Sequence, residues 1–149
     1  NLAHCRRAGA NYHLNVGPTA TGRIPDYETA ALRRAGEWVE RYCDPIYEGK
    51  PTPFACQGRD FILEAKGKLY YFVFDLAISG HGNVTVSLGG TGPRPIKGLD
   101  HPIRSVHWMD NHEELKFTHN PQDGLAAIDF TGYPYGTNLV VRVAEIELH

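Results

Sequence analysis

The sequence predicts a protein of mixed class, in which one strand and one helix precede an all-β antiparallel sandwich. Between residues 27 and 42, apolar side chains recur at helical spacing. After residue 57 they fall in short β-branched and aromatic runs, separated mostly by Gly, Pro, Asn or Asp, as is typical of a sandwich. Pro45, Pro51 and Pro53 lie between these patterns and indicate a stiff connector without helical or strand periodicity. We therefore place a domain boundary there, with residues 1–50 in the first unit and 51–149 in the second.

Composition describes an ordinary globular chain. The 149 residues carry a formal net charge of −2, with 42% hydrophobic and 21% charged residues. This balance gives no reason to expect a nucleic-acid partner. No run reaches the roughly 18 apolar residues that a membrane span needs, so no membrane partner is expected either. The first residue is Asn rather than Met, and we expect the chain to be a piece of a longer polypeptide.

The first 25 residues predict the end of one helix, a strand and a sharp turn. Residues 2–8 have the pattern of a helix tail, with Gly9 in the position of a C-terminal cap. Residues 12–16 form a short apolar run that fits a buried strand. Gly17 and Pro18 end it, because proline cannot donate a hydrogen bond to a sheet. Pro25 then fits the first position of a helix, where a missing N–H costs nothing.

The helix that follows is amphipathic and should cover about four turns. Its apolar residues form one stripe, and negative charges occupy its first turn, where the helix dipole favours them. One strand and one helix cannot bury such a stripe without another layer. The stripe consists of Tyr27, Ala31, Ala35, Trp38, Val39 and Tyr42.

Seven runs predict the strands of the sandwich. In residues 68–74 both alternating sets of side chains are apolar, which predicts a central strand covered on both faces. In the last run the apolar phase changes, and we expect a β-bulge near Ala144. The predicted strands are residues 61–63, 68–74, 83–88, 103–108, 114–118, 127–130 and 139–148.

The segment NYHLNVGPTATGRIP at residues 11–25, followed by GEW at 36–38 and PIYEG at 45–49, resembles the α-L-fucosidases of glycoside hydrolase family twenty-nine. His13 stands where that family usually has leucine. The resemblance implies that residues 1–50 are the last strand and helix of a TIM-like catalytic barrel. Residues 51–149, similar more diffusely, would be the C-terminal β-sandwich that braces it.

The resemblance also implies an activity. The full-length parent would be a retaining glycoside hydrolase that releases terminal α-L-fucose from fucosylated glycans, without a cofactor. Such hydrolysis needs two opposed carboxyl groups. The nucleophile and the acid/base of the family lie before residue 1, so no catalytic residue is expected in this segment and the 149 residues alone should be inactive. We expect a secreted, periplasmic or lysosome-like protein.

Asn15 and His13 are the candidate substrate-binding residues. If residues 12–16 are the last barrel strand, Asn15 lies at its carboxyl end, where barrel enzymes build their sites. His13 faces the same way in a strand. The alternatives are that Asn15 only ties down the following turn by local hydrogen bonds, and that His13 packs inside the barrel. For each residue the structural alternative is favoured.

Other chemistry is less strongly indicated. Four histidines, His101, His107, His112 and His119, lack the convergent spacing of a metal site, and no metal is expected. Asn83 begins an N-glycosylation acceptor sequence.

Three cysteines are too few for a disulfide framework. Two of them, flanking the connector, could pair in a secreted protein, although small buried free thiols are favoured; the cysteines are Cys5, Cys43 and Cys56.

A second function from another class is a non-catalytic carbohydrate-binding module. Trp108, Tyr133 and Tyr135 fall in or near loops of the predicted sandwich, and aromatic rings there could stack on a sugar ring. The alternative, which is favoured, is that the two tyrosines belong to a turn packed against the neighbouring domain.

Overall fold

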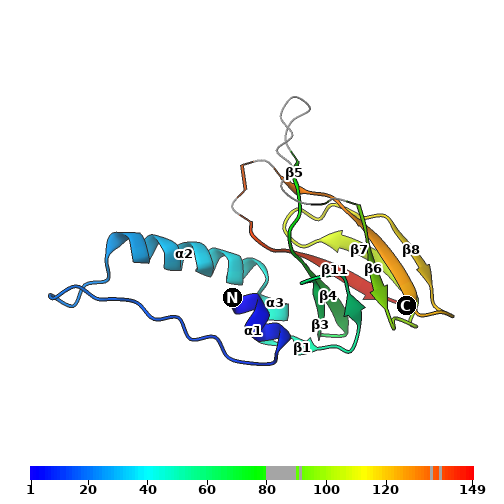
Figure 1. Cartoon of the computed structure of the whole chain (residues 1–149), viewed down its shortest axis with the longest axis horizontal. Coiled ribbons are helices and arrows are strands. Elements are labelled where there is room, and N and C mark those ends of the chain that lie inside the picture. The colour runs from blue at the N-terminus through cyan, green and yellow to red at the C-terminus, as the bar shows by residue number, and fades with distance from the viewer. Residues whose placement is uncertain (80–89, 91, 135, 138) are drawn as a thin grey trace.

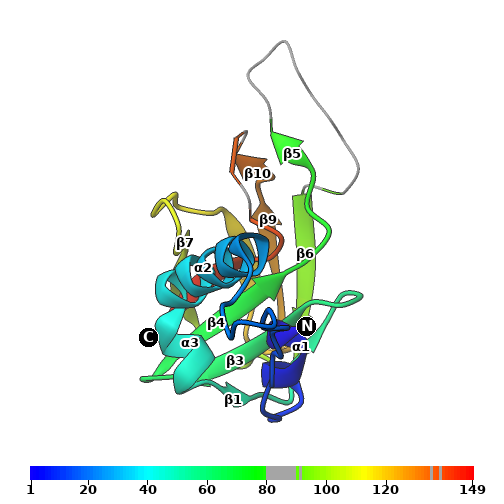
Figure 2. The same cartoon turned by 90° about the vertical axis from the view of Figure 1, so that its left-hand side faces the viewer.

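The computed structural model describes residues 1–79, 90, 92–134, 136–137 and 139–149. Two antiparallel sheets pack face to face, and three helices lie against the outer face of one of them (Figures 1 and 2). The predicted antiparallel sandwich is therefore confirmed. No helix among the described residues is long and apolar enough to cross a membrane.

The first sheet has five strands and includes the two ends of the sandwich sequence. In it the last strand of the chain, β11 (Arg142–Leu148), pairs antiparallel with β4 (Lys68–Val73), the second of the predicted strands. Along the sheet the strands are β1 (Lys50–Pro51), β3 (Phe61–Ala65), β4 (Lys68–Val73), β11 (Arg142–Leu148) and β7 (Ile103–Trp108).

The second sheet has four strands, and two of them, β2 and β6, were not predicted. Its strands are β2 (Ala55–Cys56), β6 (Gly92–Lys97), β9 (Leu125–Phe130) and β8 (Phe117–Asn120). Strand β6 escaped prediction because Pro93 and Pro95 interrupt the expected pattern. Strand β9 pairs with β6 along its whole length, whereas β2, on the other side, pairs only with Ile96 and Lys97. Pro93 and Pro95 therefore have no partner strand on the β2 side, where a missing N–H costs little. A short parallel pair joins β5 (Ile78–Ser79) to β10 (Tyr133–Pro134).

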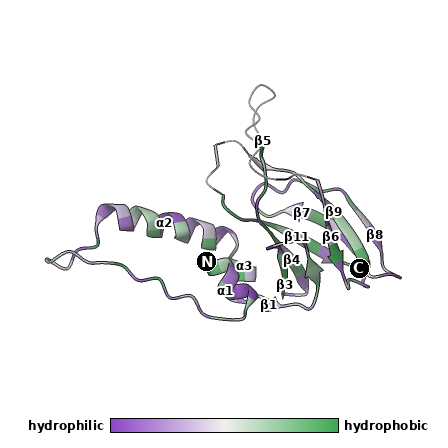
Figure 3. Ribbon diagram, viewed as in Figure 1, coloured by the Kyte–Doolittle hydropathy of each residue, from purple (hydrophilic) through white to green (hydrophobic). Residues whose placement is uncertain are grey.

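Strand β4 is the centre of the fold, as the sequence predicted. Leu69, Tyr71 and Val73 face the second sheet and belong to the sandwich core. Tyr70 and Phe72 face the helices, and belong to a second cluster that we call the helix-side core. Figure 3 shows hydrophobic residues along β4 and in the strands that pack around it.

The predicted β-bulge near Ala144 is wrong. Strand β11 keeps an unbroken register with β4 from Arg142 to Ile146, and its only irregularity with β7 falls between Glu147 and Leu148. The apolar phase changes because the strand is covered on different faces along its length. Val143 belongs to the helix-side core, whereas Ala144 and Ile146 belong to the sandwich core.

The predicted helix tail and the predicted amphipathic helix are both present as α1 (Leu2–Arg7) and α2 (Asp26–Arg41). Gly9 has a φ of 66°, as a C-terminal cap requires. Pro25 lies one position earlier than predicted, as the N-cap residue of α2 rather than its first helical residue. The connector was expected to be irregular, but it contains α3 (Cys43–Tyr47) and the short strands β1 and β2. Gly49 makes this compact turn possible, because a Cβ there would lie 2.1 Å from the Pro45 carbonyl oxygen.

Helix α2 is covered by the sandwich at one end only. Trp38 and Val39 pack against the helix-side core, next to the fully buried Tyr42. Closer to its start Tyr27 is 73% exposed, and none of the helix's sixteen residues is buried. The five-stranded sheet therefore supplies part of the further layer that the stripe was expected to need.

Residues 12–16 do not form a strand, contrary to prediction. They are extended and exposed, in a long segment that leaves α1, runs away from the sheets and turns back at the start of α2 (Figure 1). A strand needs a neighbour for its backbone N–H and C=O groups, and the described residues offer none to this segment.

One strand prediction is misplaced, and another falls on residues that the structure does not describe. The run at residues 114–118 was placed too early, because β8 covers Phe117–Asn120, while Glu114 makes only an isolated bridge with His107. The run at residues 83–88 lies outside the described residues.

A buried ion pair joins the end of β7 to the start of β11. The Arg142 guanidinium is fully buried and donates to both carboxylate oxygens of Asp110, each at 3.0 Å. It also donates to the Gly132 carbonyl at 2.8 Å and lies 4.0 Å from the centre of the Trp108 ring. Such a set satisfies the buried charge, so removing one partner is costly.

We expect Asp110→Ala to lower the free energy of unfolding by about 3–5 kcal/mol, because it leaves the Arg142 charge buried and unpaired. Urea unfolding followed by tryptophan fluorescence measures the loss. Glu37→Ala is the matched control. It breaks the Arg34–Glu37 pair, whose side chains are 62% and 60% exposed, and should cost less than about 0.5 kcal/mol. Equal losses would contradict the role given to the buried pair.

Candidate functional site

The candidate functional surface is built from the exposed segment between α1 and α2 and from the apolar stripe of α2. Tyr12, Leu14 and Val16 are 38%, 50% and 36% exposed, although they alternate as the buried residues of a strand would. The segment is held at its far end, where the Glu28 carboxylate accepts a hydrogen bond from the Gly17 N–H at 2.9 Å.

His13 and Asn15 both lie exposed on this segment. Among the described residues, the structure does not bring either side chain into a cluster with other candidate residues. The first N–H group after the run, that of Gly17, is bound by Glu28 rather than by Asn15. Substrate binding by Asn15 and His13 stays a prediction.

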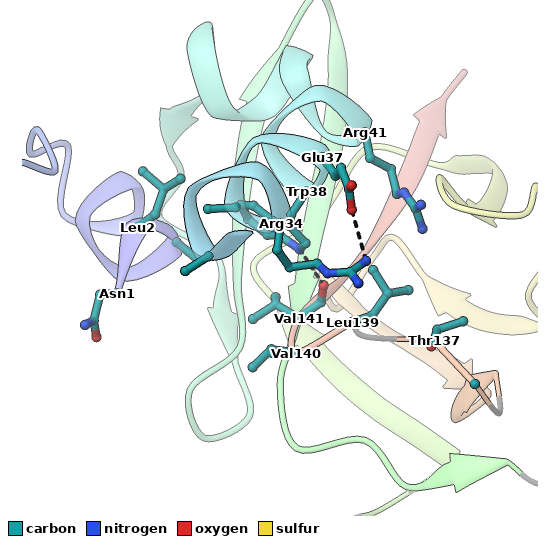
Figure 4. A pocket seen from close by; sticks show the side chains of 14 residues that line it. Asn1, Leu2, Arg34, Glu37, Trp38, Arg41, Thr137, Leu139, Val140 and Val141 are labelled. Atoms are coloured by element: carbon teal, nitrogen blue, oxygen red, sulfur yellow. Dashed lines mark hydrogen bonds and ion pairs between the residues drawn. The ribbon is translucent and has the colours of Figure 1, made fainter. Parts of the chain in front are cut away.

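A pocket of about 710 Å³ opens beside the stripe (Figure 4). One wall comes from Asn1 and Leu2 at the start of α1, and another from the face of α2 that carries Ala31, Ala35 and Trp38. Its third wall is the segment that leads into β11, residues 139–141. The sequence signal for this wall was the unbroken apolar run that opens the last predicted strand.

The polar contacts of the pocket fix its shape. The Trp38 indole N–H donates to the Val141 carbonyl at 3.0 Å, which ties α2 to the chain entering β11. On the rim, Arg34 pairs with Glu37 at 3.0 Å. Val140, in the third wall, is 77% exposed. The pocket therefore combines an apolar lining with charged side chains at its rim.

A second, smaller and more polar pocket of about 330 Å³ lies where β3 begins and β4 ends. The Asp60 carboxylate is buried there and accepts hydrogen bonds from the Phe74 N–H at 2.8 Å and from Arg94 at 2.7 Å. Burial nevertheless raises the pKa of Asp60 above its ordinary value, since desolvation outweighs these bonds. Arg94 also donates to the Phe74 carbonyl, so these charges serve to join the two sheets.

The histidines do not form a metal site in the part of the chain that the structure describes, where no group of three or more potential ligands was found. His119 has a structural role instead. Its Nδ1 accepts from the Ile103 N–H at 3.2 Å, so its Nε2–H is left to donate to the Leu99 carbonyl at 2.9 Å.

The aromatic residues considered for sugar stacking are mostly buried. Trp108 is fully buried in the sandwich core, and its N–H donates to the Thr131 hydroxyl at 2.8 Å, so the proposed stacking role is wrong for this residue. Tyr133 is 9% exposed and donates its hydroxyl to the Val140 carbonyl. Tyr135 and the glycosylation candidate Asn83 lie outside the described residues.

All three cysteines are free. Cys43 is exposed rather than buried as expected, whereas Cys5 and Cys56 are half-buried. Burial raises the pKa of the Cys56 thiol to about 11, which disfavours the reactive thiolate.

Comparison with known proteins gives one curated relative and many similar structures, while no family model matches. The chain is 32% identical over 77 residues to an α-L-fucosidase of Dictyostelium discoideum, a match that covers 48% of this chain and 16% of the relative.

The solved structures match almost the whole chain. An α-L-fucosidase isoenzyme from Paenibacillus thiaminolyticus has a TM-score of 0.70 at 19% identity, over 97% of this chain and 32% of that one. A family 29 α-L-fucosidase from Bacteroides thetaiotaomicron has a TM-score of 0.70 at 17% identity, over 98% and 30%. The Thermotoga maritima α-fucosidase has a TM-score of 0.65 at 19% identity, over 97% and 33%.

These comparisons confirm the resemblance to the α-L-fucosidases of family 29. The chain has the fold of one part of these enzymes and spans about a third of the length of the solved chains. That share fits a C-terminal piece.

In the native chain we expect Cys43 to be alkylated by iodoacetamide at pH 8 and Cys56 to react slower by about two orders of magnitude, because burial and the raised pKa reduce its thiolate fraction. Peptide mass spectrometry over time measures both rates. Cys43→Ser should remove the fast reaction and Cys56→Ser should leave it. In concentrated urea both thiols should react alike. A Cys56 as fast as Cys43 in the native chain would contradict the burial, and a disulfide would contradict the free thiols.

We also expect Trp38→Ala to lower the free energy of unfolding of this chain by about 1–3 kcal/mol, since a half-buried ring and its hydrogen bond to Val141 are lost. Tyr27→Ala, on the same stripe but 73% exposed, should change it by less than about 0.5 kcal/mol. Thermal unfolding of the two variants makes the comparison. If Tyr27→Ala costs as much as Trp38→Ala, the start of α2 is covered in solution and the exposed stripe is not real.

Proposed function

We propose that this chain is the C-terminal portion of a retaining α-L-fucosidase that hydrolyses terminal α-L-fucosyl linkages. The observation that carries the proposal is the fold likeness over 97% of the chain to fucosidases three times its length, together with the ordered motif of residues 11–49. Retention of configuration is proposed because the Bacteroides thetaiotaomicron relative was trapped as a covalent intermediate with 2-fluoro-fucosyl fluoride.

The proposed partner is a catalytic barrel formed by the upstream part of the polypeptide. Two features support it. Residues 12–16 alternate like a strand but have no pairing neighbour among the described residues. The stripe of α2 is apolar but exposed from Tyr27 to Ala35. Both would be satisfied if residues 12–16 joined a parallel sheet and α2 covered it, as strand and helix do in a barrel.

The proposed role of the sandwich is to brace that barrel. The C-terminal end of α2 is fixed to the five-stranded sheet by Trp38, whose ring packs on Tyr42 at 5.2 Å and whose N–H bonds to Val141. The same helix would lie on the barrel along its earlier turns. A rigid sheet at one end of the last helix would thus limit the movement of the last strand and of Asn15 beside it.

The alternative of a carbohydrate-binding module receives little support from the described residues. Stacking on a sugar needs an exposed aromatic face, but Trp108 is fully buried and Tyr133 is nearly so. We therefore propose a bracing rather than a glycan-binding role for residues 51–149.

We expect the full-length protein to hydrolyse an aryl α-L-fucoside, and the 149-residue chain to show no turnover, because the proposed nucleophile and acid/base lie upstream. Release of the aryl group, followed by absorbance, measures both. The β-linked fucoside is the control substrate and should not be cleaved. A full-length protein that folds but leaves the α-fucoside intact would overturn the proposed activity, and turnover by the isolated chain would overturn the placement of the catalytic groups.

A further inference from the structure

The Glu28 carboxylate links the strand-like run of residues 12–16 to helix α2. One of its oxygens accepts a hydrogen bond from the Gly17 N–H at 2.9 Å, and the other accepts from the Tyr27 hydroxyl at 3.1 Å. A Cβ on Gly17 would lie 3.4 Å from the second oxygen, so the carboxylate lies directly against the backbone at this turn. The run therefore ends on a side chain of the helix that follows it.

The start of α2 leaves this carboxylate free to bind Gly17. Glu28 is the third residue of the helix, the position from which a glutamate normally reaches back to the N–H of the N-cap residue. Here the N-cap residue is Pro25, which has no N–H to offer. The Glu28 carboxylate therefore makes its bond to the loop before the helix and not to the helix itself.

The rest of this loop is closed by its own hydrogen bonds. The Thr19 N–H donates to the Arg23 carbonyl and the Gly22 N–H donates to the Thr19 carbonyl, both at 2.8 Å. The Thr19 hydroxyl also accepts from the Arg23 N–H at 3.1 Å. Figure 1 shows this turn at the far tip of the segment between α1 and α2. Since Pro18 has no N–H, Gly17 carries the donor that ties the end of the run to the helix.

We propose that Glu28 is a positioning residue of the proposed fucosidase and holds Asn15 in place through the Gly17 backbone. This rests on the proposed function, in which Asn15 lies at the carboxyl end of the last barrel strand. The Asn15 amide bonds to no other described residue, so its direction depends on the backbone that carries it. Trp38 fixes α2 to the sandwich about 15 Å further along the helix. The bracing by the sandwich thus reaches Asn15 through one hydrogen bond.

Steady-state kinetics of the full-length protein with an aryl α-L-fucoside test the proposal. Glu28→Ala should lower kcat/KM about tenfold, because Asn15 loses its fixed position. Glu28→Gln keeps an oxygen that can accept from Gly17 and should stay within about twofold of the unaltered protein. Asp26→Ala is the matched control. It removes a negative charge from the same helical turn without touching Gly17, and should also stay within about twofold.

The control variants also decide between a hydrogen bond and a charge. If Glu28→Gln loses as much kcat/KM as Glu28→Ala, or if Asp26→Ala does, the acidic side chains act through the helix dipole and the proposal is overturned.

A double-substitution cycle separates positioning from a general loss of structure. Asn15→Ala should itself lower kcat/KM about tenfold, and adding Glu28→Ala should lower it little further, since Glu28 acts through Asn15. Losses that multiply to about a hundredfold would show that the two residues act independently, and would overturn the proposal. Full activity in either single variant would overturn it as well.

The hydrogen bond itself is tested in the 149-residue chain without any activity. In Glu28→Ala the Gly17 N–H should exchange with solvent about tenfold faster, as followed by NMR, because its acceptor is lost. The Gly22 N–H, which donates to the Thr19 carbonyl, is the internal control and should not change. An unchanged rate at Gly17 would overturn the proposal even if the full-length variants failed to fold.

The role of Glu28 and the proposed function are judged by different measurements. Turnover by the unaltered full-length protein judges the proposed function, whereas the ratios among the variants and the Gly17 exchange rate judge the role of Glu28. An active protein that tolerates Glu28→Ala would overturn the positioning role alone. A full-length protein without turnover would overturn both.

Discussion

Strand β4 is apolar on both faces, and the arrangement of the rest of the molecule follows from the need to cover both. Tyr71 and Val73 are fully buried against the second sheet, while Tyr70 and Phe72 are equally buried beneath the helices. A strand of this kind cannot lie at a solvent-facing surface, since each exposed aromatic would forfeit a stabilisation of a few kcal/mol. The five-stranded sheet is consequently the middle layer of three. This constraint couples the first 50 residues to the sandwich.

The coupling runs through few contacts, and they lie at one end of α2. Trp38 stacks edge-on against Tyr42 and bonds to Val141, and Tyr42 is buried completely. On the other side of the strand, the Arg142 guanidinium lies over Trp108 and pairs with Asp110. The start of β11 is thus fixed from both faces. A contact along the exposed part of α2 would be positioned relative to this strand, as the proposed bracing role requires.

The surfaces left open have a common character. Residues 12–16, the early turns of α2 and the pocket at Val140 each expose apolar side chains, and all lie on the helical side of the molecule. By contrast, the polar groups of the second pocket are paired with one another, as Asp60 is with Arg94. Most of the exposed large apolar side chains, among them Tyr12, Leu14 and Tyr27, lie on this side, whereas Leu125 on β9 is 46% exposed on the other. The solved fucosidase chains that share this fold are about three times as long.

By itself the sequence determined the elements whose pattern is local. The helix from Asp26, the two-sided strand β4 and β7 all follow from spacing and side-chain type, and the motif of residues 11–49 indicated the family resemblance. Tertiary structure decided what depends on partners. Residues 12–16 have the pattern of a strand but no neighbour to pair with, whereas β6 contains two prolines and is a strand because β9 pairs with it. For the same reason Trp108, considered as an exposed stacking residue, is buried, and Cys43, expected to be buried, is exposed. Burial depends on which distant segments pack together, and a one-dimensional pattern records only which side chains could be buried.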